Sequence, residues 1–552
     1  MALETNSLTL LCVEDNKTTQ LLYKALLQEE VKELICAEDG EKGFNAFLEH
    51  SIDIIITDYE MPILSGIEMV RKIREVDANI PIIFATAIDD TNIIIEALHL
   101  GVNGFVKKPI HSSELLHALE NASKLLLANR VINERREKEL NELQKKDEYY
   151  ASQENLAFAK ELNILRNDFY YQMVGEQNIS LIDFLYQPLD VISGDAYSAR
   201  RIDQHRTFYL IVDGMGKGLS ASLTTMTMTS FVNHIIDKMI EHESFSLDIL
   251  IKESIDYIKP ILLDEEALAI DYILFDHHYN RLHYAKFAMP VFLLQDKNNT
   301  IIKLKSNNPP LSKWQDSYKI DEYDIKNVDK FLFYSDGIVE NSVNEKNATY
   351  ADYIVEDFQN SFTREELKEK IFSKITMQED DLTLIFINKF DYTNSHITQK
   401  IFQTSLKNVE DAGDWYEKLL GEMCENPTLS YKANVVFTEL FMNAYEHGNL
   451  GIDASTKHKM LEEDTYFDSL LEKEQSCNKN ITVDINKITN QTSTYIVTQI
   501  TDEGVGFNTQ ILSEIFRNSQ TFNGRGVFVS RKNSMGIYYN TQGNSVLYLN
   551  KI

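Results

Sequence analysis

Short apolar runs alternate with helix-like segments along the first 125 residues of the chain. The apolar runs, which are typical of buried strands, are Leu8–Val13, Ile52–Thr57, Ile80–Thr86 and Gly104–Val106. Between them, the segments Gly66–Ile73 and Asn92–Leu100 place apolar residues at helical spacing. This alternation predicts βαβ units arranged around a parallel sheet.

A long polar helix is predicted next. Residues 110–174 contain no Gly and no Pro, and apolar residues such as Leu115 and Leu119 recur at spacings of three and four. At ~1.5 Å per residue, ~60 helical residues would extend ~90 Å. The apolar positions fit a coiled coil with a second copy, whereas the polar interruptions Asp147 and Glu154 also fit a single solvated linker helix.

The pattern changes twice more along the chain. From about 180 to 390, strand-like runs such as Thr207–Val212 and Leu382–Ile387 have helices between them. From about 400 to 552, helical segments precede strands, and the polar stretch 452–480 is interpreted as an insertion or a mobile lid. The sequence therefore predicts a multidomain α/β protein with domains at 1–125, 179–390 and 400–552 and a helical linker at 126–178.

Composition narrows the class of protein. At ~150 residues per domain, 552 residues predict three to four domains. The chain has 54 Lys and Arg against 85 Asp and Glu, a net charge of −31, so nucleic acid and anionic membranes are not expected as partners. Four cysteines without a CxxC spacing fit a reducing cytoplasm, and the sequence shows neither a signal peptide nor an apolar membrane span.

Chemically active side chains follow the predicted strands of the first domain. Glu14 and Asp15 follow one strand, Asp58 and Thr86 each end another, and Lys108 follows the last. Because the carboxyl ends of parallel strands meet at one edge of an open sheet, these groups are expected to converge. Gathered carboxylates favour Mg²⁺, and a Mg²⁺-neutralised carboxylate can accept a phosphoryl group. Lys and Thr side chains would hold the phosphoryl oxygens.

Over about 8–125 these residues resemble the receiver domain of bacterial two-component response regulators. The resemblance implies a flavodoxin-like fold and an upstream histidine kinase as partner. The roles that it implies are phosphoacceptor for Asp58, Mg²⁺ ligands for Glu14, Asp15, Asp58 and the Glu60 carbonyl, phosphoryl contacts for Thr86 and Lys108, a switch pair for Thr86 and Phe105, and a cis proline for Pro109.

A second set of acidic residues lies beside strand-like runs between 180 and 390. Its members are Asp195, Asp213, Asp336 and Asp380. Asp213 and Asp336 each stand before a Gly and after a strand, which places the carboxylate at a strand end. Such carboxylates, gathered between two sheets, can hold two divalent ions ~3.5–4 Å apart that activate a bridging water. The sequence shows no evident Ser or Cys nucleophile, which favours attack by metal-bound water.

These motifs resemble the PPM-type serine/threonine phosphatases, in the bacterial branch associated with sporulation and stress response, over about 180–390. The resemblance implies an α/β/β/α sandwich that binds two Mn²⁺ or Mg²⁺. The stretch AKFAMP at 285–290 departs from the Asn-Ala-Gly-His of many relatives, which bears on substrate fit. The implied roles are bridging ligand for Asp213, carbonyl ligand for Gly214, ligands of one ion for Asp336 and Asp380, a place at or near the ions for Asp195, and a secondary role for Asp381.

A third set lies near the carboxyl end of the chain. Glu439, Asn443 and His447 are spaced by four and share one helix face, where a carboxylate and a carboxamide can hold Mg²⁺ beside a triphosphate. Asp502 follows a strand and can accept a hydrogen bond from an exocyclic amine such as that of adenine. The glycines that would let the backbone approach a nucleotide are Gly504, Gly506, Gly524 and Gly526.

Over about 400–552 this set resembles the GHKL-type ATP-binding fold, an α/β sandwich, in its anti-sigma-factor and serine-kinase branch. The resemblance implies Asn443 as Mg²⁺ ligand, Glu439 as general base and Asp502 as the residue that reads adenine. We find no histidine-bearing dimerisation helix before it, so a Ser or Thr hydroxyl of a partner is the expected phosphate acceptor. ATP binding without phosphate transfer remains an alternative.

Together the three sets predict a cytoplasmic response regulator that dephosphorylates a phosphoserine or phosphothreonine protein. The resemblance implies a STAS-type anti-sigma-factor antagonist as substrate and an opposing ATP-dependent serine kinase. The imperfect heptads of the helical linker predict a homodimer formed through it. One alternative is an ATP-bound trap for a sigma factor or anti-sigma factor, in which the phosphatase only tunes partner binding. Another is a phosphatase that hydrolyses a different phosphate compound.

Overall fold

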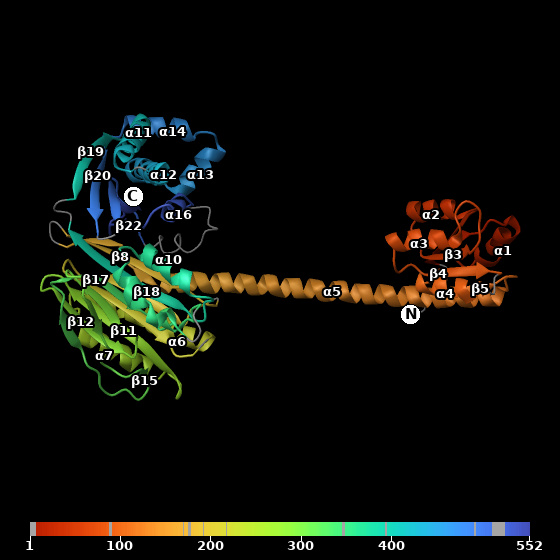
Figure 1. Ribbon diagram of the computed structural model, residues 1–552, viewed down its shortest axis with the longest axis horizontal. Helices are drawn as coiled ribbons and strands as arrows, with labels where there is room; N and C mark the ends of the chain where they lie inside the picture. Colours follow the sequence, from red (N-terminus) through yellow and green to blue (C-terminus); the bar gives the residue numbers. More distant parts are fainter. Residues whose placement is uncertain are drawn as a thin grey trace. The chain divides into compact units, whose positions relative to one another are not determined.

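A computed structural model describes residues 7–552 except 88–90, 169, 175–177, 191, 217, 345–347, 392–394, 425, 491–492 and 510–524. The chain divides into two compact units, residues 1–151 and 152–552 (Figure 1). Within the ranges just given, no helix combines the length and apolar character needed to cross a membrane.

The first unit is built on a five-stranded parallel sheet. Its elements are β1 (Thr9–Val13), α1 (Lys17–Leu27), β2 (Glu33–Ala37), α2 (Gly40–Glu49), β3 (Ile54–Asp58), α3 (Gly66–Val76), β4 (Ile82–Thr86), α4 (Thr91–His99) and β5 (Gly104–Lys107). The strand order is β2-β1-β3-β4-β5. Leu10 and Leu11 pack into different apolar clusters, so both faces of the sheet are covered. The predicted parallel sheet is therefore present, with β2 as an edge strand that the apolar pattern did not indicate.

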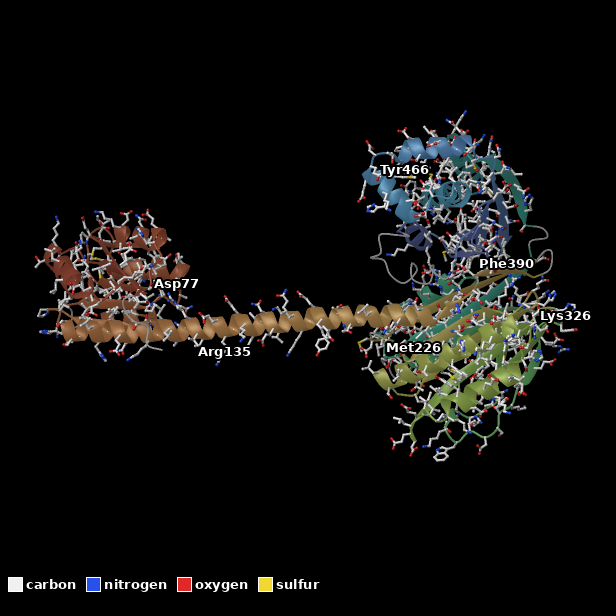
Figure 2. The ribbon with its side chains drawn as sticks, turned by 180° about the vertical axis from the view of Figure 1, so that it is seen from behind. Asp77, Arg135, Met226, Lys326, Phe390 and Tyr466 are labelled. Atoms are coloured by element: carbon white, nitrogen blue, oxygen red, sulfur yellow. The ribbon has the colours of Figure 1, made fainter. Side chains whose placement is uncertain are left out.

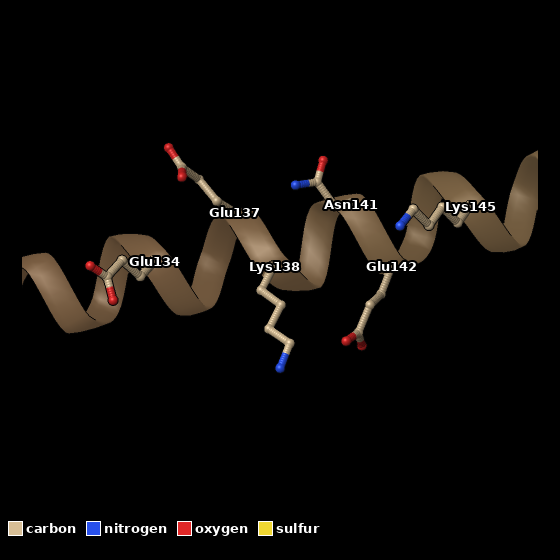
Figure 3. Close-up of a pocket in the computed structure, with 6 residues that line it drawn as sticks. All are labelled: Glu134, Glu137, Lys138, Asn141, Glu142 and Lys145. Carbon is tan, nitrogen blue, oxygen red and sulfur yellow. The ribbon is translucent and has the colours of Figure 1, made fainter.

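Helix α5 (Ser112–Ile164) is 53 residues long. Its first turns are buried against the first unit through Leu115 and Leu119. The middle turns carry polar side chains that project from the helix, and Figure 3 shows Glu134, Glu137, Lys138, Asn141, Glu142 and Lys145. The helix ends before the predicted position 174, because Leu165 is buried in a cluster with Tyr197 and the chain continues as a strand.

Two mainly antiparallel sheets pack face to face in the second unit. The first contains β6 (Arg166–Asn167), β9 (Asp195–Arg201), β10 (Arg206–Gly214), β11 (Ala267–Asp276), β12 (Arg281–Phe287), β15 (Leu311–Ser312) and β16 (Asp321–Asp324). The second contains β7 (Tyr171–Val174), β8 (Asn178–Gln187), β13 (Phe292–Asp296), β14 (Ile301–Leu304), β17 (Val328–Tyr334) and β18 (Leu382–Asp391). Ile211 and Ile273 of one sheet meet Phe331 and Ile385 of the other in a shared core.

Helices cover the outer face of each of these sheets. On the first sheet, α6 (Leu219–Glu241) and α7 (Leu247–Ile258) bury residues such as Val232 and Ile251 against the strands. On the second sheet lie α8 (Gly337–Glu340), a 3₁₀ turn (Tyr350–Asp352), α9 (Ile354–Gln359) and α10 (Arg364–Lys374). The layers are helix, sheet, sheet and helix, which agrees with the four-layer sandwich expected for this region.

A smaller helix-on-sheet region follows within the second unit (Figure 1). Its antiparallel sheet has the order β19-β20-β21-β23-β22, and its ranges are His396–Gln403, Asn480–Thr489, Thr494–Asp502, Ser545–Lys551 and Ile537–Tyr539. Its helices are α11 (Leu406–Met423), α12 (Pro427–Asn443), a π-helix (Ala444–Asn449), α13 (Ala454–Glu462), α14 (Tyr466–Gln475) and α16 (Arg525–Lys532). The stretch expected to be a polar insertion or lid forms α13 and α14, because Tyr466 (labelled in Figure 2) and Leu470 are buried in the core.

This region and the sandwich share one apolar core. Tyr170 and Leu181 of the sandwich belong to the same cluster as the residues of the smaller region. A buried carboxylate also joins the two regions, because Asp183 on β8 pairs with Arg531 on α16 at 3.0 Å. A second link joins Glu366 on α10 to Lys551 on β23 at 2.8 Å.

Candidate functional sites

The predicted acidic cluster of the first unit is assembled at the carboxyl ends of its strands. Glu14, Asp15 and Asp58 each offer a carboxylate oxygen, and these oxygens lie within 4.8 Å of one another. Lys108, just after β5, donates to Glu14 at 2.7 Å and to Asp58 at 2.5 Å. Asp58 also accepts the backbone N–H of Tyr59 at 2.7 Å, which fixes its orientation.

Charge in this cluster is only partly balanced. Burial raises the pKa of Glu14, the charge of Asp58 raises it further, and Lys108 opposes both. Burial lowers the pKa of Lys108, but its hydrogen bonds to Asp58 and Glu14 outweigh burial, so that its pKa is raised and the ammonium form is favoured. One ammonium among three carboxylates leaves a net negative charge. An all-oxygen donor set of this kind fits Mg²⁺.

The remaining receiver residues lie around this cluster. Thr86 is buried at the end of β4, and the Lys108–Pro109 peptide bond is cis, as the resemblance implied. The Phe105 ring is partly exposed and stacks on Phe84 with 6.3 Å between ring centroids. The Glu60 carbonyl as a ligand stays a prediction.

The sandwich brings the second acidic set to neighbouring strand ends. Asp195 on β9 and Asp213 on β10 are directly paired across the two strands. Asp336 follows β17 after Ser335, Asp380 stands just before β18, and these two strands are paired in the facing sheet. Two strand pairs, one from each sheet, therefore present carboxylates at the same edge of the sandwich.

The carboxylates of this set raise one another's pKa. Burial raises the pKa of Asp213 well above its usual range, and the charges of Asp195, Asp336 and Asp380 raise it further. Burial likewise raises the pKa of Asp195, while a hydrogen bond from Ser335 at 2.6 Å opposes the shift. Such mutual repulsion favours a bound cation.

The spacing of these carboxylates differs from that of the first cluster. In the described part of the chain, only the group around Asp58 brings three carboxylates within 4.8 Å of one another. Ligands shared between two ions have to spread over a larger space than ligands of one ion. The wider spacing of the sandwich aspartates, with carboxylate and carbonyl oxygens as donors, is compatible with two divalent ions.

Asp381 holds the loop that leads to Asp195. Its carboxylate accepts the backbone N–H groups of Leu189 and Gly194, both at 2.6 Å. Burial raises its pKa, and these two hydrogen bonds oppose the shift. The secondary role predicted for Asp381 is therefore a positioning role.

Gly337 was not singled out by the sequence patterns, although it follows Asp336 in an Asp-Gly pair. A Cβ at position 337 would lie 2.0 Å from the backbone oxygen of Asp381. Only glycine lets the end of β17 come this close to the Asp380–Asp381 segment, so Gly337 sets the distance between two predicted ligands.

The unusual 285–290 stretch serves the core of the sandwich. Lys286 is fully buried and donates to both carboxylate oxygens of the fully buried Asp271 at 3.0 Å. Burial raises the pKa of Asp271 to about 7 and lowers that of Lys286 to about 8, while their mutual attraction opposes both shifts. The described contacts of Lys286 are thus structural, between the strands β11 and β12.

The third predicted set is assembled in part. Burial raises the pKa of Tyr539, and the charges of Glu439 and Asp502 raise it further, so both carboxyls lie near Tyr539. Burial raises the pKa of Asp502 to about 6, and the backbone N–H of Gly504 donates to it at 2.8 Å. Burial also raises the pKa of Glu439. The buried Asp502 carboxyl beside close-packed backbone fits recognition of a polar ring edge.

The remaining residues of the third set agree with the predicted nucleotide site only in part. Asn443 is the last residue of α12, and His447 makes a hydrogen bond with the Ile452 carbonyl, which ties the His447 ring to the backbone. Gly506 has a φ of +76° and a Cβ there would lie 1.9 Å from the oxygen of Gln542, so glycine is required. Gly524 lies outside the described residues, and Gly526 lies in α16.

Comparison with known proteins divides the chain in the same way. Residues 10–120 match the response regulator receiver domain, and residues 203–389 match the family of stage II sporulation protein E (SpoIIE). A chemotaxis protein CheY of Halobacterium salinarum is 30% identical over 111 residues, which cover 20% of this chain and 92% of that protein. A cyclic di-GMP phosphodiesterase of Thermotoga maritima is 31% identical over 159 residues, 27% of this chain and 42% of the relative.

Solved structures with similarity include the RsbU and RsbW domains of a Mycobacterium tuberculosis protein. That structure is 12% identical, covers 67% of this chain and 94% of its own, and has a TM-score of 0.35. The chain spans about half the length of the first curated relatives that it matches. Through residues 10–120 the chain belongs to the response regulator receiver family, and it also carries a SpoIIE-type phosphatase domain of the PPM class.

The contact at Gly337 predicts a specific loss of metal affinity. Gly337→Ala must push the end of β17 away from Asp381, so the Mn²⁺ concentration for half-maximal hydrolysis of p-nitrophenyl phosphate should rise about tenfold, the equivalent of ~1.4 kcal/mol. Gly421→Ala is the matched control, because a Cβ there meets nothing within 4 Å. An unchanged Mn²⁺ dependence in Gly337→Ala would contradict this role.

Proposed function

We propose that this protein is a response regulator whose output is metal-dependent hydrolysis of phosphoserine or phosphothreonine in a partner protein. The observation that carries the proposal is the edge of the sandwich, where Asp195, Asp213, Asp336 and Asp380 come together in the SpoIIE-type domain. The proposed substrate, from the resemblance, is a STAS-type anti-sigma-factor antagonist.

In this proposal the carboxylates hold two Mn²⁺ or Mg²⁺ ions. Asp213 would hold both ions, the Gly214 carbonyl would bind one of them, and Asp336 and Asp380 would bind the other. When bound, the ions supply an activated water and neutralise phosphate charge. Ser335, which donates to Asp195, keeps that carboxylate facing the edge of the sandwich.

Asp213 gives the most direct test of the metal centre. Asp213→Asn should lower Mn²⁺-dependent hydrolysis of p-nitrophenyl phosphate by on the order of 10²-fold or more, because a bridging ligand and a negative charge are lost together. Asp203→Asn, in the exposed turn before β10, removes the same charge from the surface and should leave the rate near that of the wild type. Full activity in Asp213→Asn would show that the ligand assignment is wrong.

The receiver domain is proposed to control this activity. A histidine kinase would phosphorylate Asp58, and the change would reach the phosphatase through α5. The helix exposes apolar residues along its middle turns, and a homodimer formed by pairing of two α5 helices would bury them. These residues are Val131, Ile132, Leu140 and Leu143.

Beryllofluoride, which mimics a phosphoryl group on a carboxylate, tests this coupling. Addition to the full chain should change the phosphatase rate by on the order of tenfold, as expected for a coupling of ~1–3 kcal/mol between sites. The Asp58→Asn variant should not respond, because it lacks the carboxylate that binds the mimic. Equal rates with and without beryllofluoride in the wild type would refute the coupling.

The carboxyl-terminal region is proposed to bind ATP and Mg²⁺ and to act as the opposing serine kinase. Asn443 would bind Mg²⁺, Glu439 would act as general base and Asp502 would accept from the adenine amine. The buried Asp502 beside the Gly504 amide supports a nucleotide site. The second candidate is an ATP-dependent trap that binds a sigma factor or an anti-sigma factor without transferring phosphate.

Labelled ATP separates these two candidates. With ATP-γ-³²P and a STAS-domain partner, label on a partner serine supports a kinase, whereas a stable unlabelled complex supports a trap. In either case Asp502→Asn should weaken binding of a fluorescent ATP analogue about tenfold or more, because the amine loses its charged acceptor. Asp484→Asn, on the neighbouring strand β20, is the control. Unchanged nucleotide affinity in Asp502→Asn would argue against the proposed pocket.

A further inference from the structure

An apolar stripe on α6 is covered at one end and open at the other. Leu219, Leu223 and Met226 lie at positions i, i+4 and i+7 and therefore share one face of the helix. Met226 (labelled in Figure 2) is 6% exposed because it packs with Leu165 and Tyr197. Leu219 and Leu223, in the first turns of the same stripe, are 77% and 71% exposed.

The open end of the stripe lies beside the metal-binding edge. A Cβ at Gly214, next to Asp213, would lie 2.9 Å from the Ala221 oxygen, so the first turn of α6 packs directly on the end of β10. The Ser222 hydroxyl donates to the Ile192 carbonyl at 3.2 Å, which places the same turn against the loop that Asp381 holds. The first turn of α6 thus contacts two segments that carry predicted ligands.

These two segments also expose apolar side chains. Met215, which follows Gly214, is 57% exposed, and Leu189, whose N–H is held by Asp381, is 41% exposed. We call Leu189, Met215, Leu219 and Leu223 the rim patch. Single exposed apolar residues are common on protein surfaces, but several around one charged edge indicate a binding surface.

Hydrogen bonds tie the first turn of α6 to the segment before β11. Ser220 donates to Glu266 at 2.7 Å, and Glu266 also accepts the N–H of Leu263 at 3.0 Å. Leu219 and Leu223 are thereby presented in a defined place before any partner binds. A preorganised apolar surface loses little entropy on binding, which favours recognition.

We propose that the rim patch binds apolar side chains that flank the phosphorylated residue of the partner protein. This inference rests on the proposed phosphatase function, because a phosphoserine that reaches Asp213 brings its neighbours onto Leu189, Met215 and the first turns of α6. Apolar neighbours gain from burial there. Acidic neighbours are disfavoured by the net charge of −31 of the chain.

Two phosphoserine peptides test this selectivity on the full chain. One has Leu and Phe on both sides of the phosphoserine, and the other has Gly and Ser at the same positions. With Mn²⁺, the wild type should hydrolyse the apolar peptide with about tenfold higher kcat/KM, mainly through a lower KM. The double variant L219Q/L223Q, which is neutral and compatible with a helix, should lose most of this ratio.

Tyr279→Gln is the matched control, because Tyr279 is 70% exposed in the turn between β11 and β12 and should leave the ratio unchanged. A wild type that hydrolyses p-nitrophenyl phosphate without preferring the apolar peptide overturns this inference and leaves the phosphatase function intact. A wild type that hydrolyses none of the three compounds overturns both. A change from dimer to monomer in L219Q/L223Q, measured by light scattering, would assign the rim patch to a second copy and overturn the inference.

Discussion

Repulsion between carboxylates at strand ends is the constraint on which the sites of this protein depend. The two acidic clusters meet that repulsion differently. In the receiver domain, Lys108 lies between Glu14 and Asp58 and supplies a permanent positive charge. In the sandwich, the described hydrogen bonds to Asp195 and Asp381 come from a hydroxyl and from backbone amides, which are neutral. The first cluster is partly neutralised from within, whereas these contacts of Asp195 and Asp381 bring no positive charge to the second.

Much of the fold was predictable because it follows from local pattern. Strands that are buried on both faces appear as continuous apolar runs, and β3 and β4 were predicted on that basis. Strand β2 was missed because it is an edge strand that begins with an exposed Glu33. The end of α5 was also misplaced, since it is set by the packing of Leu165 against Tyr197 and not by a Gly or Pro in the sequence.

The candidate ligands were predictable for a similar reason, because an acidic residue after an apolar run lies at the end of a strand. The residues that position those ligands were harder to find, since their contacts join distant parts of the chain. Asp381 holds Gly194 across 187 positions, and no local pattern reveals such a pair. The close approach of Gly337 to the Asp381 carbonyl is likewise a property of the folded backbone.

The apolar core shared by the sandwich and the carboxyl-terminal region limits where the chain can be divided without breaking that core. Sequence matching places the border of the SpoIIE-type segment at residue 389, yet Tyr170, Ile179 and Leu181 pack into the cluster that lies beyond that border. A recombination event that cut at residue 389 would leave these side chains without their neighbours. An exchange of the carboxyl-terminal region therefore has to carry Tyr170, Ile179 and Leu181 with it to keep the shared core intact.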